Sequence, residues 1–339
     1  MGKNLRIGLL GAGRIGKLHA TNIQNRIDGV EITMVADPFM NAAMRQWSKE
    51  IGIEVCTDNT DEVFTNAQVD AVFICSSTDT HADFIVKAAR AGKHIFCEKP
   101  IHTDIEKIRE ALAVVAETGV KLQVGFVRRF DRSHKAVQET VASGILGKPH
   151  IIKVCSRDPE APPLDYVKVS GGIFVDMMVH DFDMARFLSG SEITEVAAIG
   201  SCMICPDFAK YGDVDTAIVT LKFENGAIGV IDNSRQASYG YDQRVEVHCE
   251  KGCVQDDNHL LDAVKISTAK NVTTAKPTWF FLERYNDAFI AEVQEFVDAV
   301  VNDKEVSVGG KAGMMSVMAA MAAKKSLDEK RPVQLSELL

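Results

Sequence analysis

The chain has 339 residues, of which 46% are hydrophobic and 25% charged, and its formal net charge is −9. This globular composition excludes disordered, collagen-like and low-complexity proteins, and the length suits about two domains. The acidic balance argues against nucleic acid or an anionic membrane as the partner.

The sequence contains no candidate for a membrane span or a secretory signal. The longest uncharged apolar run, residues 313–323, is shorter than the ~20 residues that a span needs and is followed by two lysines. The apolar run near the N-terminus is too short for a signal peptide and leads directly into a glycine motif. We therefore expect a cytoplasmic protein.

The eight cysteines are too sparse for a disulfide scaffold. Cys202 and Cys205 form a CxxC pair, and Cys249 and Cys253 form a CxxxC pair, so together they could imitate a zinc site. The first pair lies in a strand-like stretch that ends at Pro206, which is unlike a zinc knuckle. Ordinary core cysteines and no metal are the favoured interpretation.

The first 125 residues alternate strand-like and helix-like patterns. Strands are expected at residues 5–10, 31–36, 70–75, 94–97 and 121–124. Helices are expected from the glycine motif to about residue 25, and at 41–51, 81–91 and 103–118, where Thr103 and Glu106 match a capping box. This alternation predicts a parallel, doubly wound sheet.

The pattern changes after about residue 148, where strand-like runs follow one another with short turns. They cover residues 150–156, 196–203, 216–223, 227–233 and 244–248, with Asn225-Gly226 as a hairpin turn. Helices are expected at 172–188, 283–301 and 311–326. We therefore predict an α/β protein with a Rossmann domain at 1–125 and a second α/β domain at 126–339, whose large sheet is mostly antiparallel and open.

The glycine motif has the setting of a dinucleotide-binding fingerprint. Its residues, Gly11-Ala12-Gly13-Arg14-Ile15-Gly16, follow an apolar strand and open a helix, and Asp37 ends the next strand 21 residues after Gly16. Such glycines allow a tight turn and close approach of the backbone to a pyrophosphate. The alternative is a turn needed only for packing.

Asp37 indicates which dinucleotide is preferred. Its carboxylate can accept hydrogen bonds from the adenine-ribose hydroxyls and would repel a 2′-phosphate. The next residue is Pro38, where an arginine could have bound that phosphate. NAD is therefore favoured over NADP, although Asp37 could instead cap the following segment.

Two further groups could carry chemistry. Lys99, within Glu98-Lys99-Pro100, follows the fourth strand, where parallel sheets bind ligands. Asp176 and His180 are four residues apart on an expected helix, as a general base and its supporting carboxylate would be. A solvated loop lysine, a helix-end carboxylate, a core histidine or two metal ligands remain alternatives for these residues.

Two polar and aromatic segments are unremarkable on their own. Arg128-Arg129-Phe130-Asp131 follows the fifth strand, and Tyr239-Gly240-Tyr241-Asp242 precedes the last one. In isolation they would be a solvated helix end and a turn.

Together these motifs resemble the glucose-fructose oxidoreductase, inositol dehydrogenase and rhizopine catabolism (Gfo/Idh/MocA) family over the whole chain. The motifs are GLLGAGRIGKLHA at 8–20, VADP at 35–38, CEKP at 97–100, GFVRRFD at 125–131, GGIFVDMMVHDFDMARFL at 171–188 and YGYDQR at 239–244. The motifs GFVRRFD and YGYDQR are most similar to the inositol dehydrogenase branch.

The resemblance implies a catalytic group of Lys99, Asp176 and His180. His180 would take the hydroxyl proton, Asp176 would orient His180, and Lys99 would bind the reacting oxygen, aimed by a cis Lys99–Pro100 bond. Substrate contacts would come from the catalytic group and Arg128, Asp158, Asp183 and Tyr241. Cofactor contacts would come from Gly11, Ala12, Gly13, Arg14, Ile15, Gly16, Asp37, Ser76, Thr78, His81, Glu98 and Lys99.

The resemblance also implies an activity: NAD-dependent oxidation of a cyclic polyol, with myo-inositol converted to 2-keto-myo-inositol (scyllo-inosose) in polyol catabolism. Another inositol isomer or a pyranose sugar is the alternative substrate, and a non-catalytic NAD-binding regulator is the alternative class. A homotetramer is expected, formed by stacking of the second-domain sheets.

Overall fold

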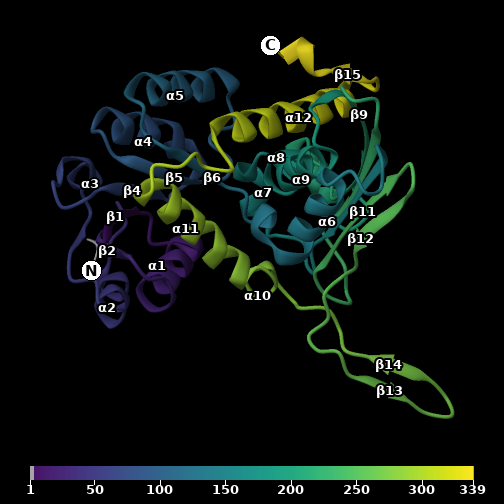
Figure 1. Cartoon of the computed structure of the whole chain (residues 1–339), viewed down its shortest axis with the longest axis horizontal. Helices are drawn as coiled ribbons and strands as arrows, with labels where there is room; N and C mark the ends of the chain where they lie inside the picture. Colours follow the sequence, from purple (N-terminus) through teal and green to yellow (C-terminus); the bar gives the residue numbers. More distant parts are fainter. Residues whose placement is uncertain (1–3, 339) are drawn as a thin grey trace. The chain divides into compact units, whose positions relative to one another are not determined.

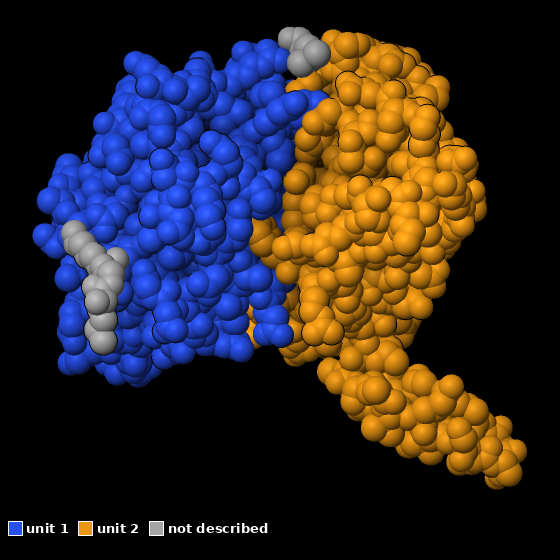
Figure 2. All heavy atoms as spheres, in the orientation of Figure 1, with its two compact units in different colours: residues 1–127, 287–315 blue, residues 128–286, 316–339 orange. Residues whose placement is uncertain are grey.

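The computed structural model describes residues 4–338 and divides into two compact units. Unit 1 comprises the residues up to 127 together with 287–315, and unit 2 comprises 128–286 together with the residues from 316 onward (Figure 2). The chain therefore returns to unit 1 after completing most of unit 2. The predicted division into 1–125 and 126–339 did not include this return. None of the helices within 4–338 has the length and apolar character to cross a membrane.

Unit 1 is built on a six-stranded sheet in the order β3-β2-β1-β4-β5-β6, in which every pair of neighbours is parallel. The strands are β1 (Leu5–Leu10), β2 (Val30–Ala36), β3 (Cys56–Thr57), β4 (Ala71–Ile74), β5 (His94–Glu98) and β6 (Leu122–Gly125). The predicted parallel sheet is confirmed, and only the short β3 was not expected. The strand order reverses between β1 and β4, which is where such sheets bind ligands.

Five helices connect these strands, and a sixth joins the unit from later in the chain (Figure 1). They are α1 (Arg14–Arg26), α2 (Ala42–Glu50), α3 (Asp61–Thr65), α4 (Thr78–Arg90), α5 (Ile105–Thr118) and, after the return of the chain, α11 (Asn286–Val301). The Asp104 side chain caps α5 by accepting from the Glu106 N–H at 2.9 Å. The expectation that Thr103 caps this helix was therefore wrong by one residue.

Helix α11 completes the core of unit 1. Phe73 of β4 and Phe96 of β5 stack with ring centroids 4.5 Å apart, and Phe296 of α11 meets the Phe73 ring edge-on at 5.5 Å. Val293 and Val297 of α11 belong to the same buried cluster. Each such side chain contributes roughly 1.5–3 kcal/mol on burial, which explains why this distant helix folds with unit 1.

Unit 2 is built on a seven-stranded sheet in the order β12-β11-β7-β10-β9-β8-β15. The strands are β7 (Pro149–Arg157), β8 (Ile193–Ser201), β9 (Thr216–Phe223), β10 (Ile228–Ser234), β11 (Asp242–Cys249), β12 (Gly252–Asp256) and β15 (Val333–Gln334). The sheet is mostly antiparallel, as predicted, but β7 and β10 pair in parallel. The turn between β9 and β10 places Gly226 at φ +88°, as the Asn-Gly signal predicted.

The helices of unit 2 differ more from expectation. They are α6 (Arg132–Ala142), α7 (Leu164–Ser170), α8 (Gly172–Asp176), α9 (Val179–Ser189), α10 (Phe281–Arg284) and the C-terminal part of α12 (Gly310–Glu329), with 3-10 turns η1 (Val127–Phe130), η2 (Pro206–Tyr211) and η3 (Leu335–Leu338). A single helix over 172–188 was predicted, which was wrong. The Met177 and Met178 N–H groups both donate to the Ile173 carbonyl, at 3.1 and 2.8 Å, which widens the turn and separates α8 from α9.

A two-stranded hairpin extends from the body of unit 2 (Figures 1 and 2). It consists of β13 (Lys265–Ser267) and β14 (Val272–Thr274), whose side chains are all exposed. A bridge between Leu260 and Pro277 closes its base. The sequence pattern gave no indication of this hairpin.

Candidate active site

Two glycines of the motif in unit 1 are required by packing. Gly11 has φ +96°, and a Cβ there would lie 2.6 Å from the Cys75 carbonyl oxygen. A Cβ at Gly16 would lie 2.0 Å from the Gly11 oxygen. Any side chain at either position would therefore disrupt the turn between β1 and α1.

Gly13 has a different role, because a Cβ at this position would meet no atom within 4 Å. It is the N-cap residue of the 13-residue helix α1 and supplies no side-chain cap. The first N–H groups of a helix and its dipole favour an anion. The open space over Gly13 therefore fits the pyrophosphate of a dinucleotide.

Asp37 lies beside this turn, at the end of β2. Its carboxylate accepts hydrogen bonds from the Ala12 N–H at 2.7 Å and from the Phe39 N–H at 2.8 Å. Each carboxylate oxygen can accept a further bond, so ribose hydroxyls can still be bound. This fixed negative charge next to the turn fits NAD and disfavours a 2′-phosphate.

The segment after β4 is joined to the Lys99–Pro100 loop through His81. The His81 ring lies 2.8 Å from the Pro100 oxygen through Nδ1 and 3.0 Å from the Ser76 oxygen through Nε2. The side chain is buried, and burial lowers the pKa of His81. The neutral ring has one N–H and donates to one of these two carbonyl oxygens, and its predicted contact with the cofactor stays a prediction.

Four other predicted residues lie at the same edge of the sheet. Ser76 Oγ and Thr80 Oγ1 are 2.6 Å apart, and Thr78 begins α4. Glu98 ends β5, and the following Lys99–Pro100 peptide bond is cis, as expected. The sequence therefore placed these residues correctly at the carboxyl ends of parallel strands.

Unit 2 contains a group of interacting polar residues, here called the polar cluster. Its members are Arg128, Ser156, Asp158, Asp176, Asp181, Asn233, Arg235 and Tyr241. Four of them, Arg128, Asp158, Asp176 and Tyr241, were predicted as site residues. The other four were not.

Arg128 is the centre of the polar cluster. Its guanidinium donates to Asp181 Oδ1 at 2.5 Å, to Ser156 Oγ at 3.1 Å and to the Tyr241 hydroxyl at 3.4 Å. Burial raises the pKa of Tyr241 far above its ordinary value, so its hydroxyl stays protonated. The sequence prediction that Arg128 and Tyr241 lie in one region is supported by this contact.

Three polar residues beneath Arg128 share one register position across neighbouring strands. Ser156 of β7 pairs with Asn233 of β10 and with Gln243 of β11, and all three are buried. Asn233 donates to the second oxygen of Asp181 at 2.8 Å. Polar residues at inward-facing strand positions were the sequence signal that could have revealed this part of the site.

Asp176, at the end of α8, has two described partners. The Tyr166 hydroxyl donates to Oδ1 at 2.8 Å, and the buried Arg235 donates to Oδ2 at 3.0 Å. His180 is the second residue of α9 and is half-buried. Because α8 and α9 are separate helices, the ideal four-residue helical spacing assumed from the sequence does not apply to this pair.

Asp158 follows β7 and is strongly affected by burial. Burial raises its pKa to about 6, the nearby Asp176 and Asp181 charges act in the same direction, and Arg235 and Arg128 oppose them. This carboxyl group therefore titrates within the range of working pH, next to the predicted catalytic aspartate.

Asp183 is engaged by a different arginine. Arg129 donates two bonds to it, from Nε to Oδ2 and from Nη2 to Oδ1, both at 2.7 Å. Only 1% of Asp183 is exposed. The structure thus uses Asp183 to hold Arg129, and its direct contact with substrate stays a prediction.

Within residues 4–338, two groups of three side chains could hold a metal ion. They are His19 with Glu98 and Glu292, and Asp131 with Asp256 and His259. Neither group contains a cysteine or any member of the predicted catalytic group.

Comparison with known proteins identifies the domain in each unit. Residues 5–126 match the model of the oxidoreductase family with an NAD-binding Rossmann fold, and residues 134–255 match the GFO/IDH/MocA C-terminal domain. The chain is 43% identical over 335 residues to the myo-inositol 2-dehydrogenase of Thermotoga maritima, covering 99% of this chain and 100% of that protein. It is 44% identical over 332 residues to the inositol 2-dehydrogenase of Rhizobium meliloti, covering 98% and 99%.

A solved structure is similar over the same length. It is the scyllo-inositol dehydrogenase of Lactobacillus casei with bound NAD(H) and scyllo-inositol, at 33% identity and a TM-score of 0.91, covering 98% of this chain and 100% of that one. The glycine turn, the charge of Asp37 and these similarities agree on the cofactor and the class of reaction. The chain is therefore an NAD-dependent dehydrogenase and belongs to the GFO/IDH/MocA oxidoreductase family.

Proposed function

We propose that the protein oxidises a secondary ring alcohol of myo-inositol to 2-keto-myo-inositol. The polar cluster of unit 2 carries this proposal, because its buried arginines, carboxylates and tyrosine suit a ligand that is uncharged and rich in hydroxyls. Full-length relatives named as myo-inositol and inositol 2-dehydrogenases support the same substrate.

The proposed reaction removes one proton and one hydride from a carbon–hydroxyl group. His180 takes the hydroxyl proton, and Lys99 stabilises the negative charge that develops on the oxygen. Asp176, held by Tyr166 and Arg235, supports the positive charge that His180 gains. NAD⁺, when bound, supplies the acceptor for the hydride.

The cofactor is held by unit 1. The open N-terminus of α1 at Gly13 receives the pyrophosphate, and Asp37 binds the adenine ribose. His81 keeps the segment after β4 joined to the loop that carries Lys99. This division leaves the recognition of the ring hydroxyls to unit 2.

In unit 2 we assign direct substrate contacts to Arg128, Asp158 and Tyr241. Asp183 acts through Arg129, to which it is tied by two hydrogen bonds. Charged donors and acceptors of this kind discriminate strongly between hydroxyl positions, since a misplaced hydroxyl leaves a buried polar group unpaired.

NADH formation by the purified protein tests the proposal. The kcat/KM values for myo-, scyllo- and chiro-inositol and for glucose are compared, and myo-inositol is expected to give the highest. The solved structure with bound scyllo-inositol makes that isomer the second candidate. A protein that binds NAD but reduces it with no polyol would be a regulator, contrary to the proposal.

We also propose a homotetramer that forms through the open face of the unit 2 sheet. Ile199 of β8 and Ile218 of β9 are paired neighbours, 79% and 52% exposed, and Ile228 of β10 is 51% exposed. Apolar neighbours of this kind on one sheet face indicate a surface that another copy covers. Light scattering at micromolar concentration should give four chains, and a monomer would contradict the proposal.

A further inference from the structure

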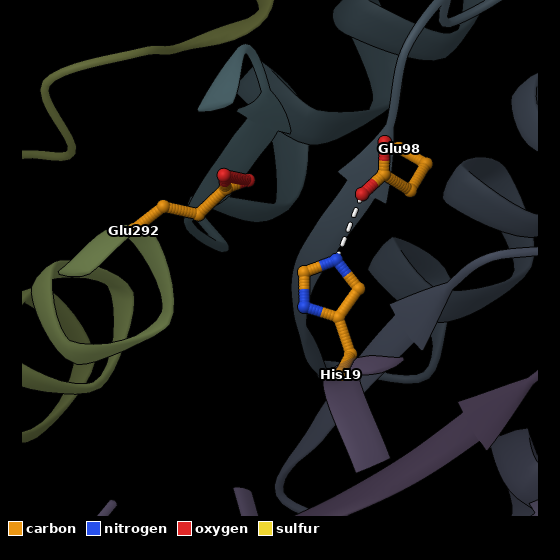
Figure 3. Close-up of side chains that lie close together, drawn as sticks. All are labelled: His19, Glu98 and Glu292. Carbon is orange, nitrogen blue, oxygen red and sulfur yellow. Dashed lines mark hydrogen bonds and ion pairs between the residues drawn. The ribbon is translucent and has the colours of Figure 1, made fainter. Parts of the chain in front are cut away.

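We propose that Glu292 is a positioning residue: in its neutral form it fixes the Glu98 carboxylate and, through it, the Lys99 loop. The inference rests on the proposed function only for the role of Lys99. It concerns three side chains of unit 1, His19, Glu98 and Glu292, that point toward one another (Figure 3).

Glu292 is a buried acid with an unusual environment. It lies on α11, none of its surface is exposed, and within residues 4–338 neither carboxyl oxygen has a hydrogen-bond partner. One of its oxygens, one oxygen of Glu98 and one ring nitrogen of His19 all lie within 4.8 Å of one another. An ionised carboxylate in this place would have a large desolvation cost.

The groups that face Glu292 favour its neutral form. Burial raises the pKa of Glu292 well above its ordinary value, and the charges of Glu98 and Glu295 raise it further. The buried Cys75 thiol near Glu292 and the buried Cys97 thiol near Glu98 have raised pKa values, so both stay neutral. A protonated Glu292 can donate, and we assign it the Glu98 carboxylate, toward which it points, as acceptor; the two groups are close but not hydrogen-bonded in the described structure.

Glu98 is held from two other directions. His19 Nε2 lies 2.8 Å from its Oε1, and the His19 ring is itself packed against the edges of Phe73, Phe96 and Phe289. Gly125 pairs with Glu98 in the sheet, and a Cβ at Gly125 would come within 3.0 Å of the Glu98 carboxylate. Because Gly125 has no side chain, the Glu98 carboxylate can occupy the space beside it.

Helix α11 is also fixed at this point. The buried Gln123 of β6 donates from Nε2 to the Glu292 carbonyl oxygen at 2.9 Å. The Glu292 side chain therefore starts from a backbone anchored to the strand beside Glu98. Since Lys99 is the next residue along the chain, a displaced Glu98 moves the start of the Lys99 loop.

The test compares two variants of Glu292 in the full-length protein. Glu292→Gln keeps the shape and donor of a neutral acid and should leave kcat within about twofold of the wild type. Glu292→Leu removes the donor and should lower kcat roughly 10- to 100-fold, as small displacements of catalytic groups do. Glu110→Gln, an exposed acid of α5, is the matched control.

Gly125→Ala is a second route to the same displacement. Its methyl group should press on the Glu98 carboxylate and lower kcat while Glu292 is intact, which keeps the proposal testable where Glu292→Leu fails to fold. A Gly125→Ala variant with wild-type kcat, or a Glu292→Gln variant as impaired as Glu292→Leu, would overturn the proposal.

An infrared difference spectrum separates this inference from the proposed function, because it needs no substrate. The wild type minus Glu292→Gln should show the C=O stretch of a protonated carboxyl group at neutral pH. Its absence would overturn the inference, as would one equivalent of a divalent metal in the purified protein, which would make the three side chains ligands. Failure of the wild type to oxidise any polyol, with the band present, would count against the proposed function alone.

Discussion

In unit 1, half of the predicted cofactor contacts lie within residues 11–16, whereas the polar cluster of unit 2 draws on several separate elements. Gly11, Gly13 and Gly16 act through backbone geometry over a few residues. Arg128 instead needs partners up to 113 residues away, such as Tyr241. A backbone-built site is thus encoded locally, while a side-chain-built site depends on the register of a whole sheet.

Two buried ion pairs of unit 2 can be compared with one exposed ion pair of unit 1. In unit 2, Arg128–Asp181 and Arg129–Asp183 are buried, with side-chain exposures of 14% or less. In unit 1, Lys87–Asp61 has exposures of 48% and 63%. Breaking a buried pair leaves an uncompensated charge, whereas an exposed pair contributes little. Four sets of variants test the comparison of the two units.

The largest effect is expected in the reaction itself. His180→Ala should lower kcat roughly 10²- to 10⁴-fold, since it removes the proposed general base. NAD affinity should stay near that of the wild type, because unit 1 holds the cofactor. Steady-state kinetics and cofactor fluorescence measure the two quantities, and His150→Ala, at an exposed position of unit 2, is the control. Retention of more than about a tenth of kcat would assign the proton acceptor to another residue.

The next effect concerns stability. Arg129→Met leaves the buried Asp183 without its two strongest bonds and should cost roughly 3 kcal/mol. That corresponds to a fall in Tm of about 4 °C for a protein of this size. Lys87→Met, the exposed counterpart in unit 1, should cost less than about 1 kcal/mol. Equal shifts in thermal unfolding would show that burial does not distinguish the two pairs.

The third effect, smaller than the first two, is a change in the preference for NAD over NADP. Asp37→Ser with Pro38→Arg removes a repelling charge and adds a phosphate partner. The NAD/NADP ratio of kcat/KM should fall roughly 10- to 100-fold, the value of a charge-assisted hydrogen bond. Asp28→Ser, at an exposed position of the same unit, is the control. A wild type that already uses both cofactors equally would contradict the role given to Asp37.

The smallest effect depends on pH. Because burial raises the pKa of Asp158 from 3.8 to about 6, its contribution to stability is fully present below pH 3.8 and is lost as the pH rises through about 6. Asp158→Asn should therefore raise Tm at pH 8, by the equivalent of roughly 1–3 kcal/mol, and should lose this advantage near pH 4. A Tm difference that is independent of pH would show that Asp158 titrates normally.

The same contrast explains how far the sequence was informative. Hydrophobic periodicity and the glycine motif were enough to predict the parallel sheet of unit 1, because both signals are local. The pairing of Ser156, Asn233 and Gln243 could not be predicted, since it depends on which strands become neighbours. The break between α8 and α9 was not predicted because the two residues that form it, Met177 and Met178, are neither proline nor glycine.

The family resemblance identified site residues that hydrophobic periodicity could not, but it did not predict the hydrogen bonds between their side chains. It placed Arg128 and Tyr241 in one site, where they do touch. It gave no sign that Arg235 and Tyr166 would bind Asp176, or that Asp183 would be taken up by Arg129. Many polar groups lie near these carboxylates, and the packing of the side chains, not the sequence motif, determines which of them form the hydrogen bonds.

The return of the chain to unit 1 has a consequence for synthesis on the ribosome. The first 127 residues leave the ribosome before α11, so the surface of Phe73 and Phe96 that Phe296 covers stays open while unit 2 is being made. The Rossmann unit cannot complete its core until nearly 300 residues have been translated. A nascent chain halted before α11 would expose this apolar surface and would be the form that chaperones must protect.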